Sequence, residues 1–211
     1  GPDRKVVMIL ALDNVSKSFG ALTVTDDVTF EVPEGQALGI IGPNGAGKST
    51  LFNLITGNLR SEQGSIHFEG RDVTRVSAME RCLTGIGRSF QIPQPFEKLT
   101  VFENLVVVQL SLLERKRLEL SRAMATQPKL LLLDEIAGGL TEGECQALIA
   151  TIKDIHAQGV TIIWIEHVLH ALTSVVERLL VLDFGKVIAI GEPEEIMASK
   201  EVQEIYLGIE V

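Results

Sequence analysis

Apolar positions in the first third of the chain follow the period of short strands. Apolar and polar side chains alternate over Val28–Val32 and again over Ser65–Glu69, as expected of strands with one buried face. Ala37–Ile41 is apolar throughout and leads into a glycine-rich loop. The next segment, Lys48–Thr56, predicts a helix that ends at Gly57. These elements indicate an antiparallel β-subdomain at the N-terminal end of the chain.

The second half alternates between apolar runs of strand length and helical patterns. The predicted strands and helices are, in order, Leu130–Leu133 (strand), Glu142–Gln158 (helix), Val160–Ile165 (strand), Val168–Glu177 (helix), Leu179–Leu182 (strand) and Lys186–Ile190 (strand). Continuous apolar strands that alternate with helices are typical of a parallel sheet covered on both faces. The predicted fold class is therefore α/β, with a parallel sheet as its core.

Three helix starts are marked by capping boxes, in which a hydroxyl residue is followed three positions later by glutamate. They are Thr100–Glu103, Ser111–Glu114 and Thr141–Glu144. The first two lie in a segment, about residues 100–127, that we interpret as a helical subdomain.

Composition and charge narrow the class of protein. Hydrophobic residues make up 45% and charged residues 22%, which is typical of a globular domain. The formal net charge of −9 argues against nucleic acid as the main partner. No apolar stretch reaches the ~18 residues of a membrane span, and no signal peptide is predicted. Cys82 and Cys145 have no metal-binding or redox spacing.

A phosphate-binding loop is the strongest chemical signal in the sequence. It fits the pattern G-x-x-x-x-G-K-[ST], follows an apolar strand and opens a helix. Glycines let backbone N–H groups turn toward phosphate, the helix N-terminus attracts anions, and the lysine reaches the β- and γ-phosphates. The predicted nucleotide-binding residues are Gly42, Pro43, Asn44, Gly45, Ala46, Gly47, Lys48, Ser49 and Thr50. The core is thus predicted to be that of a P-loop nucleotide hydrolase.

Two carboxylates end the strand Leu130–Leu133 and complete the expected chemistry. Asp134 is a candidate ligand of Mg²⁺, together with the Ser49 hydroxyl. Glu135 is the candidate catalytic residue that polarises the attacking water. The expected cofactors are a nucleoside triphosphate, which the family resemblance below implies is ATP, and Mg²⁺.

In this order and spacing, the motifs resemble the ATP-binding-cassette (ABC) ATPases over essentially the whole chain. Four further residues carry the resemblance. Gln91 stands where the family has its Q-loop, and His167 where it has its switch histidine. The resemblance implies that Gln91 contacts Mg²⁺ and the attacking water, and that His167 contacts the γ-phosphate. Phe19 matches the aromatic that stacks on adenine. Ser111 matches the signature serine, which acts on ATP held by a second subunit.

A narrower resemblance is to the branched-chain amino acid importer ATPases of bacteria. It rests on Gly87–Gln91, on Leu110–Glu114 and on the closing segment from Leu182 to Pro193. It implies a peripheral protein at the cytoplasmic face of the inner membrane. The implied partners are permease subunits, a second ATPase subunit in a homo- or heterodimer and, indirectly, a periplasmic solute-binding protein.

The sequence departs from the family in two places. The signature usually reads Ser-Gly-Gly-Gln, whereas Leu112, Leu113 and Glu114 follow the serine here. We expect Glu114 to fold back onto the helix cap, away from phosphate. From Gln91 to Ser111 there are only 20 positions, where relatives have several tens more as a helical lobe.

The predicted organisation is a single ABC ATPase domain over residues 1–211. Its antiparallel lobe covers about residues 5–35 and 64–70. The helical lobe is truncated or interrupted near positions 109/110.

Two other functions remain open at this point. One is a soluble ABC protein of DNA repair or translation, although the coiled-coil insertion or second cassette typical of those proteins is missing. The other is a regulatory subunit that binds ATP without hydrolysing it or driving amino-acid transport. The unusual signature favours this reading, whereas Glu135 and His167 oppose it.

Overall fold

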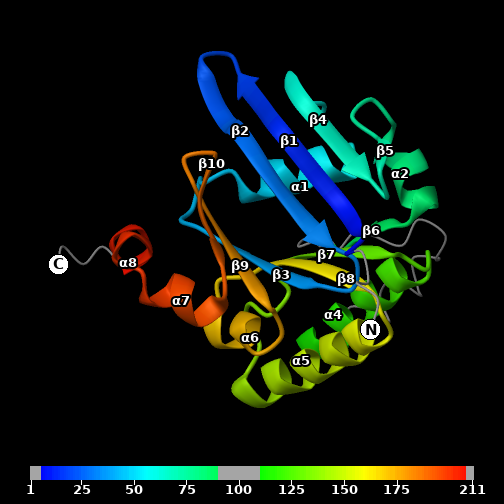
Figure 1. The fold of residues 1–211 in the computed structure, drawn as a ribbon. Helices are drawn as coiled ribbons and strands as arrows, with labels where there is room; N and C mark the ends of the chain where they lie inside the picture. The colour runs from blue at the N-terminus through cyan, green and yellow to red at the C-terminus, as the bar shows by residue number, and fades with distance from the viewer. Residues whose placement is uncertain (1–5, 90–109, 208–211) are drawn as a thin grey trace, which may run out of the picture.

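Two β-sheets frame the molecule in the computed structural model, which describes residues 6–89 and 110–207 (Figure 1). The first sheet is antiparallel, with strand order β2-β1-β4-β5. Its strands are β1 (Met8–Phe19), β2 (Leu22–Pro33), β4 (Gln63–Phe68) and β5 (Arg71–Asp72). Alternating burial along β2 puts Val28, Phe30 and Val32 on the inner face, as the pattern predicted.

The second sheet is parallel except at one edge and has the order β10-β9-β3-β8-β7-β6. Only β10 runs antiparallel to its neighbour among these described strands. The strands are β3 (Ala37–Ile41), β6 (Ile86–Arg88), β7 (Leu130–Asp134), β8 (Thr161–Ile165), β9 (Arg178–Asp183) and β10 (Lys186–Gly191). Every residue of β3, β7 and β8 is buried, which explains their unbroken apolar runs.

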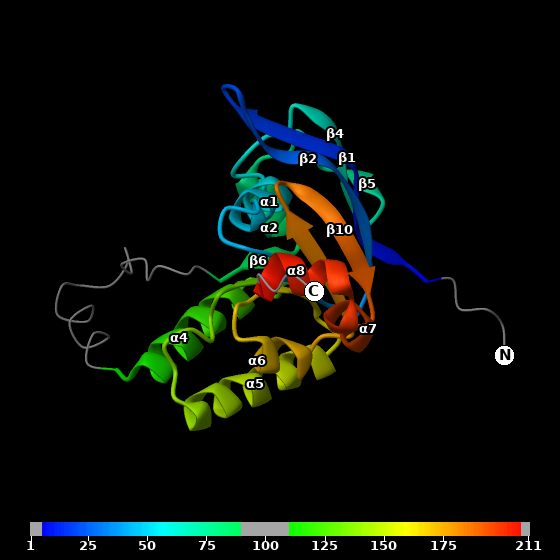
Figure 2. The ribbon, with the colours of Figure 1, turned by 90° about the vertical axis from the view of Figure 1, so that its left-hand side faces the viewer.

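Helices cover both faces of this second sheet (Figure 2). On one face, α1 (Lys48–Thr56) and α2 (Ala78–Thr84) lie between the two sheets. On the other face lie α4 (Leu112–Met124), α5 (Glu142–Ala157) and α6 (Leu169–Thr173). The chain continues with α7 (Pro193–Ala198) and α8 (Lys200–Leu207). Two apolar cores result, one on each face of the second sheet.

Most predicted elements are present, with one clear error in length. The prediction of a helix over Val168–Glu177 is wrong beyond the five residues of α6. The chain leaves the helix because the Glu177 N–H bonds to the Ala37 carbonyl of β3 at 2.9 Å, and not to a carbonyl of the preceding turn. This contact turns the backbone into β9.

Helix capping follows the sequence signals. Capping boxes at Ser111 and Thr141 are formed, and a third, at Ser77, was not anticipated. The expected box at Thr100 lies outside the described residues. Within the described ranges, no helix is long and apolar enough to cross a membrane.

Arg81 joins the end of the phosphate-loop helix to α2. Its side chain is 1% exposed, and its Nη1 donates to the carbonyls of Leu54 and Ile55, each at 2.8 Å. It also donates to Val76 and Thr74 carbonyls. Burial lowers the pKa of Arg81, and Asp72 opposes that effect. The guanidinium therefore donates to two carbonyls in the last turn of α1, where a helix leaves carbonyls without an intrahelical partner, although Leu54 also accepts the Gly57 N–H at 3.3 Å.

We predict that Arg81→Met lowers the free energy of unfolding by about 3 kcal/mol or more. At least two buried carbonyls would lose their donor, at about 1–3 kcal/mol each. Denaturant unfolding measures the change, with the exposed Arg71→Met as the control. A loss below about 1 kcal/mol would contradict the capping role.

Candidate nucleotide-binding and hydrolysis site

The phosphate loop joins the end of β3 to the start of α1. Gly47 is the N-cap of α1 with φ of 99°, and a Cβ atom there would collide with the carbonyl oxygen of Val24. A Cβ on Gly42 would likewise collide with the carbonyl oxygen of Leu182. The loop is therefore held against β2 and β9, and only glycine fits at these two positions. The N–H groups of the first turn of α1 lie at the loop, as phosphate binding requires.

Lys48 lies inside the loop that it helps to form. Its Nζ donates to the carbonyls of Gly42 at 2.6 Å and Pro43 at 3.0 Å. The side chain is buried, and burial lowers the pKa of Lys48, whereas Glu135 and Asp134 raise it. The ammonium thus lies near two carboxylates, and phosphate oxygens can replace the two carbonyls as its acceptors.

Asp134 ends β7 and is clamped by an arginine from the neighbouring strand. Its Oδ2 accepts from Arg88 Nη2 at 2.7 Å, and Arg88 Nη1 donates to Asn53 Oδ1 at 2.6 Å. The other oxygen, Asp134 Oδ1, is buried and has no hydrogen-bond partner within the described part of the chain. Such an atom needs a cation or a bound water.

These donors fit Mg²⁺. A free carboxylate oxygen and the exposed Ser49 hydroxyl are the hard oxygen ligands that Mg²⁺ prefers. The described ranges contain no cluster of three acidic, His or Cys residues that could form a closed protein cage. This suits an ion that is bound through one carboxylate, waters and substrate phosphates.

Glu135 and His167 meet although they are far apart in sequence. His167 Nε2 lies 2.8 Å from Glu135 Oε1. Because an ionised carboxylate only accepts hydrogen bonds, Nε2 carries the proton. Glu135 has φ of 49°, in the left-handed region that non-glycine residues rarely adopt. Strain of this kind clusters at functional sites and must be held by the surrounding structure.

The other predicted residues lie apart from this cluster or outside the described ranges. Phe19 is half exposed at the end of β1, with Lys17 Nζ 5.3 Å from its ring centroid, so one face is open for stacking. Ser111 caps α4, and its N–H donates to Glu114 Oε2 at 2.7 Å, as expected for a glutamate folded onto the cap. Gln91 lies outside the described residues.

Sequence reasoning missed two residues of the site, Arg88 and Glu166. Arg88 ends β6 beside β7, and Glu166 follows the apolar run of β8 yet is only 1% exposed. The common signal is a charged residue at the carboxyl end of a buried parallel strand, where such ends gather at one edge.

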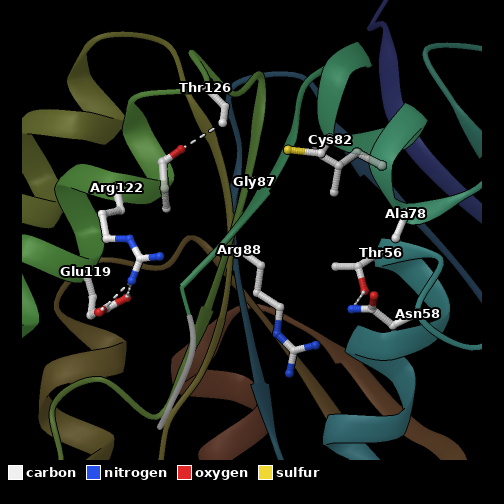
Figure 3. Close-up of a pocket in the computed structure, with 11 residues that line it drawn as sticks. Thr56, Asn58, Ala78, Cys82, Gly87, Arg88, Glu119, Arg122 and Thr126 are labelled. Atoms are coloured by element: carbon white, nitrogen blue, oxygen red, sulfur yellow. Dashed lines mark hydrogen bonds and ion pairs between the residues drawn. The ribbon is translucent and has the colours of Figure 1, made fainter. Parts of the chain in front are cut away.

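Arg88 also borders a cavity of about 260 Å³ (Figure 3). Figure 3 shows the arginine between Glu119 and Arg122 of α4 on one side and the end of α1 on the other. No phosphate-loop residue lines this cavity. The cavity is therefore separate from the phosphate loop, and the side chain of Arg88 connects it to Asp134.

Comparison with known proteins decides the family. The family described as ABC transporter matches residues 25–111. A probable branched-chain amino acid transport ATP-binding protein, LivG, of Methanocaldococcus jannaschii is 32% identical over 255 residues, covering 97% of this chain and 99% of the relative. The chain belongs to the ABC transporter ATPase family. This ABC ATPase binds and hydrolyses ATP.

Other relatives and solved structures agree with the family. The lipopolysaccharide export system ATP-binding protein LptB of Haemophilus influenzae is also 32% identical to this ABC ATPase, over 95% of this chain and 97% of the relative. A nucleotide-free ATP-binding cassette from an ABC transporter matches with a TM-score of 0.86 and 28% identity, covering 96% of this chain and all of that one. The ADP conformation of the cassette MJ1267 matches with a TM-score of 0.85 and 29% identity over 96% and 99% of the two chains.

We predict that Lys48→Ala removes most of the affinity for ATP without unfolding the domain. Alanine is a good helix former, so α1 persists, while the charge on the β- and γ-phosphates is lost. A nucleotide-binding titration and a thermal melt of the same samples test this, with the exposed Lys186→Ala as the control. Unchanged affinity, or loss of the fold without nucleotide, would contradict the assignment.

Proposed function

We propose that this ABC ATPase drives import of branched-chain amino acids, as a dimer bound to an inner-membrane permease. The contact between Glu135 and His167 carries the catalytic part of the proposal, because it pairs a general base with its orienting residue beside Lys48. Transport of branched-chain amino acids is supported by the names of relatives in three organisms. Besides the Methanocaldococcus jannaschii protein, LivG proteins of Archaeoglobus fulgidus and Salmonella typhimurium are each 31% identical over 95% of this chain.

The residues divide the work of hydrolysis as follows. Backbone N–H groups of Asn44–Ser49 and the Lys48 ammonium hold the phosphates, and Phe19 stacks on the adenine. Ser49 and Asp134 would hold Mg²⁺, which supplies charge neutralisation on the β- and γ-phosphates. Glu135 accepts a proton from the water that attacks the γ-phosphorus. His167 keeps the Glu135 carboxylate oriented and also contacts the γ-phosphate.

We predict that Glu135→Gln leaves ATP binding intact and lowers turnover by on the order of 10²–10⁴. The amide has nearly the same shape as the carboxylate but cannot accept a proton. Steady-state ATPase assays with Mg²⁺ measure the loss, and the exposed Glu142→Gln serves as the control. Turnover close to that of the parent protein would rule out Glu135 as the base.

The proposal includes a head-to-tail dimer in which Ser111 acts on ATP bound by the partner's Lys48. The helix N-terminus that Ser111 caps attracts anions, and the capping box keeps Glu114 on the cap. Leucines replace the two signature glycines, so the Ser111 hydroxyl is the polar group that this helix start keeps from the usual signature. The alternative is that Ser111 only caps α4.

We predict that subunits carrying Ser111→Arg and subunits carrying Lys48→Ala are each inactive alone but regain activity when mixed. A heterodimer then has one intact site, made of Lys48 from one subunit and Ser111 from the other. Differently tagged subunits allow the heterodimer to be purified and assayed. Absence of rescue in a verified heterodimer would leave Ser111 with its capping role alone.

The permease is proposed to contact the side of the molecule where the cavity beside Arg88 opens. Next to it, Met79 and Leu83 of α2 are 74% and 80% exposed, and Gln91 lies three residues beyond Arg88 in the sequence. Apolar side chains of this size on a surface are typical of protein contacts. A movement of the bound permease would then shift Arg88 and, through their ion pair, Asp134.

Relatives have helical-lobe residues that this sequence lacks, either because the lobe is shorter here or because the sequence is interrupted near positions 109/110. The alignment with the Methanocaldococcus jannaschii protein runs over 255 residues, whereas this chain has 211. We assign the difference to the interval between Gln91 and Ser111, where the motif spacing is short.

Lipopolysaccharide export is the competing function, because the LptB relative is as similar in sequence as LivG. Binding of the purified protein to the permeases of either system, followed by stimulated ATPase activity, separates the two.

A further inference from the structure

Glu166 is a buried carboxylate that the steps above do not use. It follows β8 directly, precedes His167 and is 1% exposed. Burying an ionised group is costly unless several donors surround it. The arrangement of its donors therefore indicates what the residue is for.

The Glu166 carboxylate bridges two loops. Oε2 accepts the N–H of Ala137 at 2.9 Å, in the loop that follows Glu135. Oε1 accepts the N–H of His167 at 2.9 Å and that of Val168 at 3.3 Å. One side chain thus ties the backbone two residues after the base to the backbone of the histidine that orients it.

Other ionisable groups face this carboxylate from neighbouring elements. Lys116 of α4 is close enough that Glu166 raises its pKa against the larger lowering effect of burial. Tyr206 of α8 and Cys145 of α5 lie near enough for Glu166 to raise their pKa values, although burial is the larger cause for both. The negative charge is therefore held by three N–H groups and one nearby ammonium.

We propose that Glu166 is the positioning residue of ATP hydrolysis, which fixes the distance and angle between Glu135 and His167. The inference rests on the proposed roles of those two residues. The backbone of Glu135 is strained, and a strained residue keeps its geometry only if its surroundings hold it. The loop beyond it is held by the Glu166 carboxylate at Ala137, so the bridge fixes the reactive pair.

The test is Glu166→Gln, which has the same shape but one acceptor fewer. Whichever way the amide is oriented, its NH₂ group faces a backbone N–H on one of the two loops. We expect kcat to fall by about 10–100-fold, the size of effect that a small misplacement of reacting groups produces. KM and ATP affinity should stay within about twofold, because the phosphate loop is untouched.

The matched control is Glu177→Gln. Glu177 also accepts a backbone N–H through its carboxylate, from Ala37 at 3.1 Å, but at the opposite end of β3. Its kcat should equal that of the parent protein. The only tryptophan, Trp164, is buried two residues before Glu166, so its fluorescence reports whether the core around the site is intact.

A double-mutant cycle with His167→Ala separates positioning from simple stabilisation. If Glu166 acts through His167, Glu166→Gln should lower kcat far less in the His167→Ala background than in the parent. Equal losses in both backgrounds, or a kcat of Glu166→Gln within about twofold of the parent, would overturn the proposal.

If Glu166→Gln does not fold, Glu166→Asp becomes the deciding variant. It keeps the charge but is too short to reach both loops, so kcat should again fall, and parent-like kcat would refute the bridge.

Glu135→Gln distinguishes failure of the positioning role from failure of the proposed function. If it abolishes turnover while Glu166→Gln does not, the proposed function stands and the positioning role fails. If Glu135→Gln is fully active, the catalytic assignment itself is wrong.

Discussion

Parallel pairing of β3, β8 and β7 is the constraint on which the site depends. The pairs Ile40–Ile165 and Asp134–Ile165 set the three strand ends level with one another. The Glu135 N–H then donates to the Ile165 carbonyl at 2.8 Å, beyond the last pair of the ladder. Because all three strands end at the same edge, the phosphate loop, the acidic pair and His167 emerge side by side.

The charges at this edge are held in a balanced arrangement. Asp134 is paired with Arg88, Glu166 accepts three backbone N–H groups, and Lys48 lies near two carboxylates. A buried charge without such partners would be strongly unfavourable. Asp134 Oδ1 is a buried carboxylate oxygen without a hydrogen-bond partner among the described residues, and a divalent cation fits there.

Arg88 connects this chemistry to the rest of the molecule. It bonds to Asp134, to Asn53 on α1 and stacks over Phe52 at 5.5 Å, while the same side chain lines the neighbouring cavity. A displacement of β6 would therefore move Arg88 and the Asp134 side chain that is paired with it. Glu166 has the corresponding position on the other side of β7, and links the loops that follow β7 and β8.

The sequence by itself determined the elements whose signals are local. The bounds of β3 and α1 were predicted to the residue, because an apolar run, a glycine-rich loop and a terminal glycine mark them. Sequence motifs identified four candidate site residues: Lys48, Asp134, Glu135 and His167. The roles of these residues stay predictions, as do those of Gln91, which lies outside the described residues, and of Ser111, whose cross-subunit contact needs a second chain.

Only the tertiary structure decided the contacts between these motifs. The contact between Glu135 and His167 joins residues 32 positions apart, the Arg88–Asp134 pair spans 46, and Glu166 reaches back 29 to Ala137. No local pattern encodes such distances, because they follow from the order in which strands pair. The short α6 is a further case, since a tertiary hydrogen bond from Glu177 to Ala37 ended the segment that the sequence pattern extended. Glu166 is another such case, because no sequence pattern singled it out, whereas the structure buries it at the edge of the sheet.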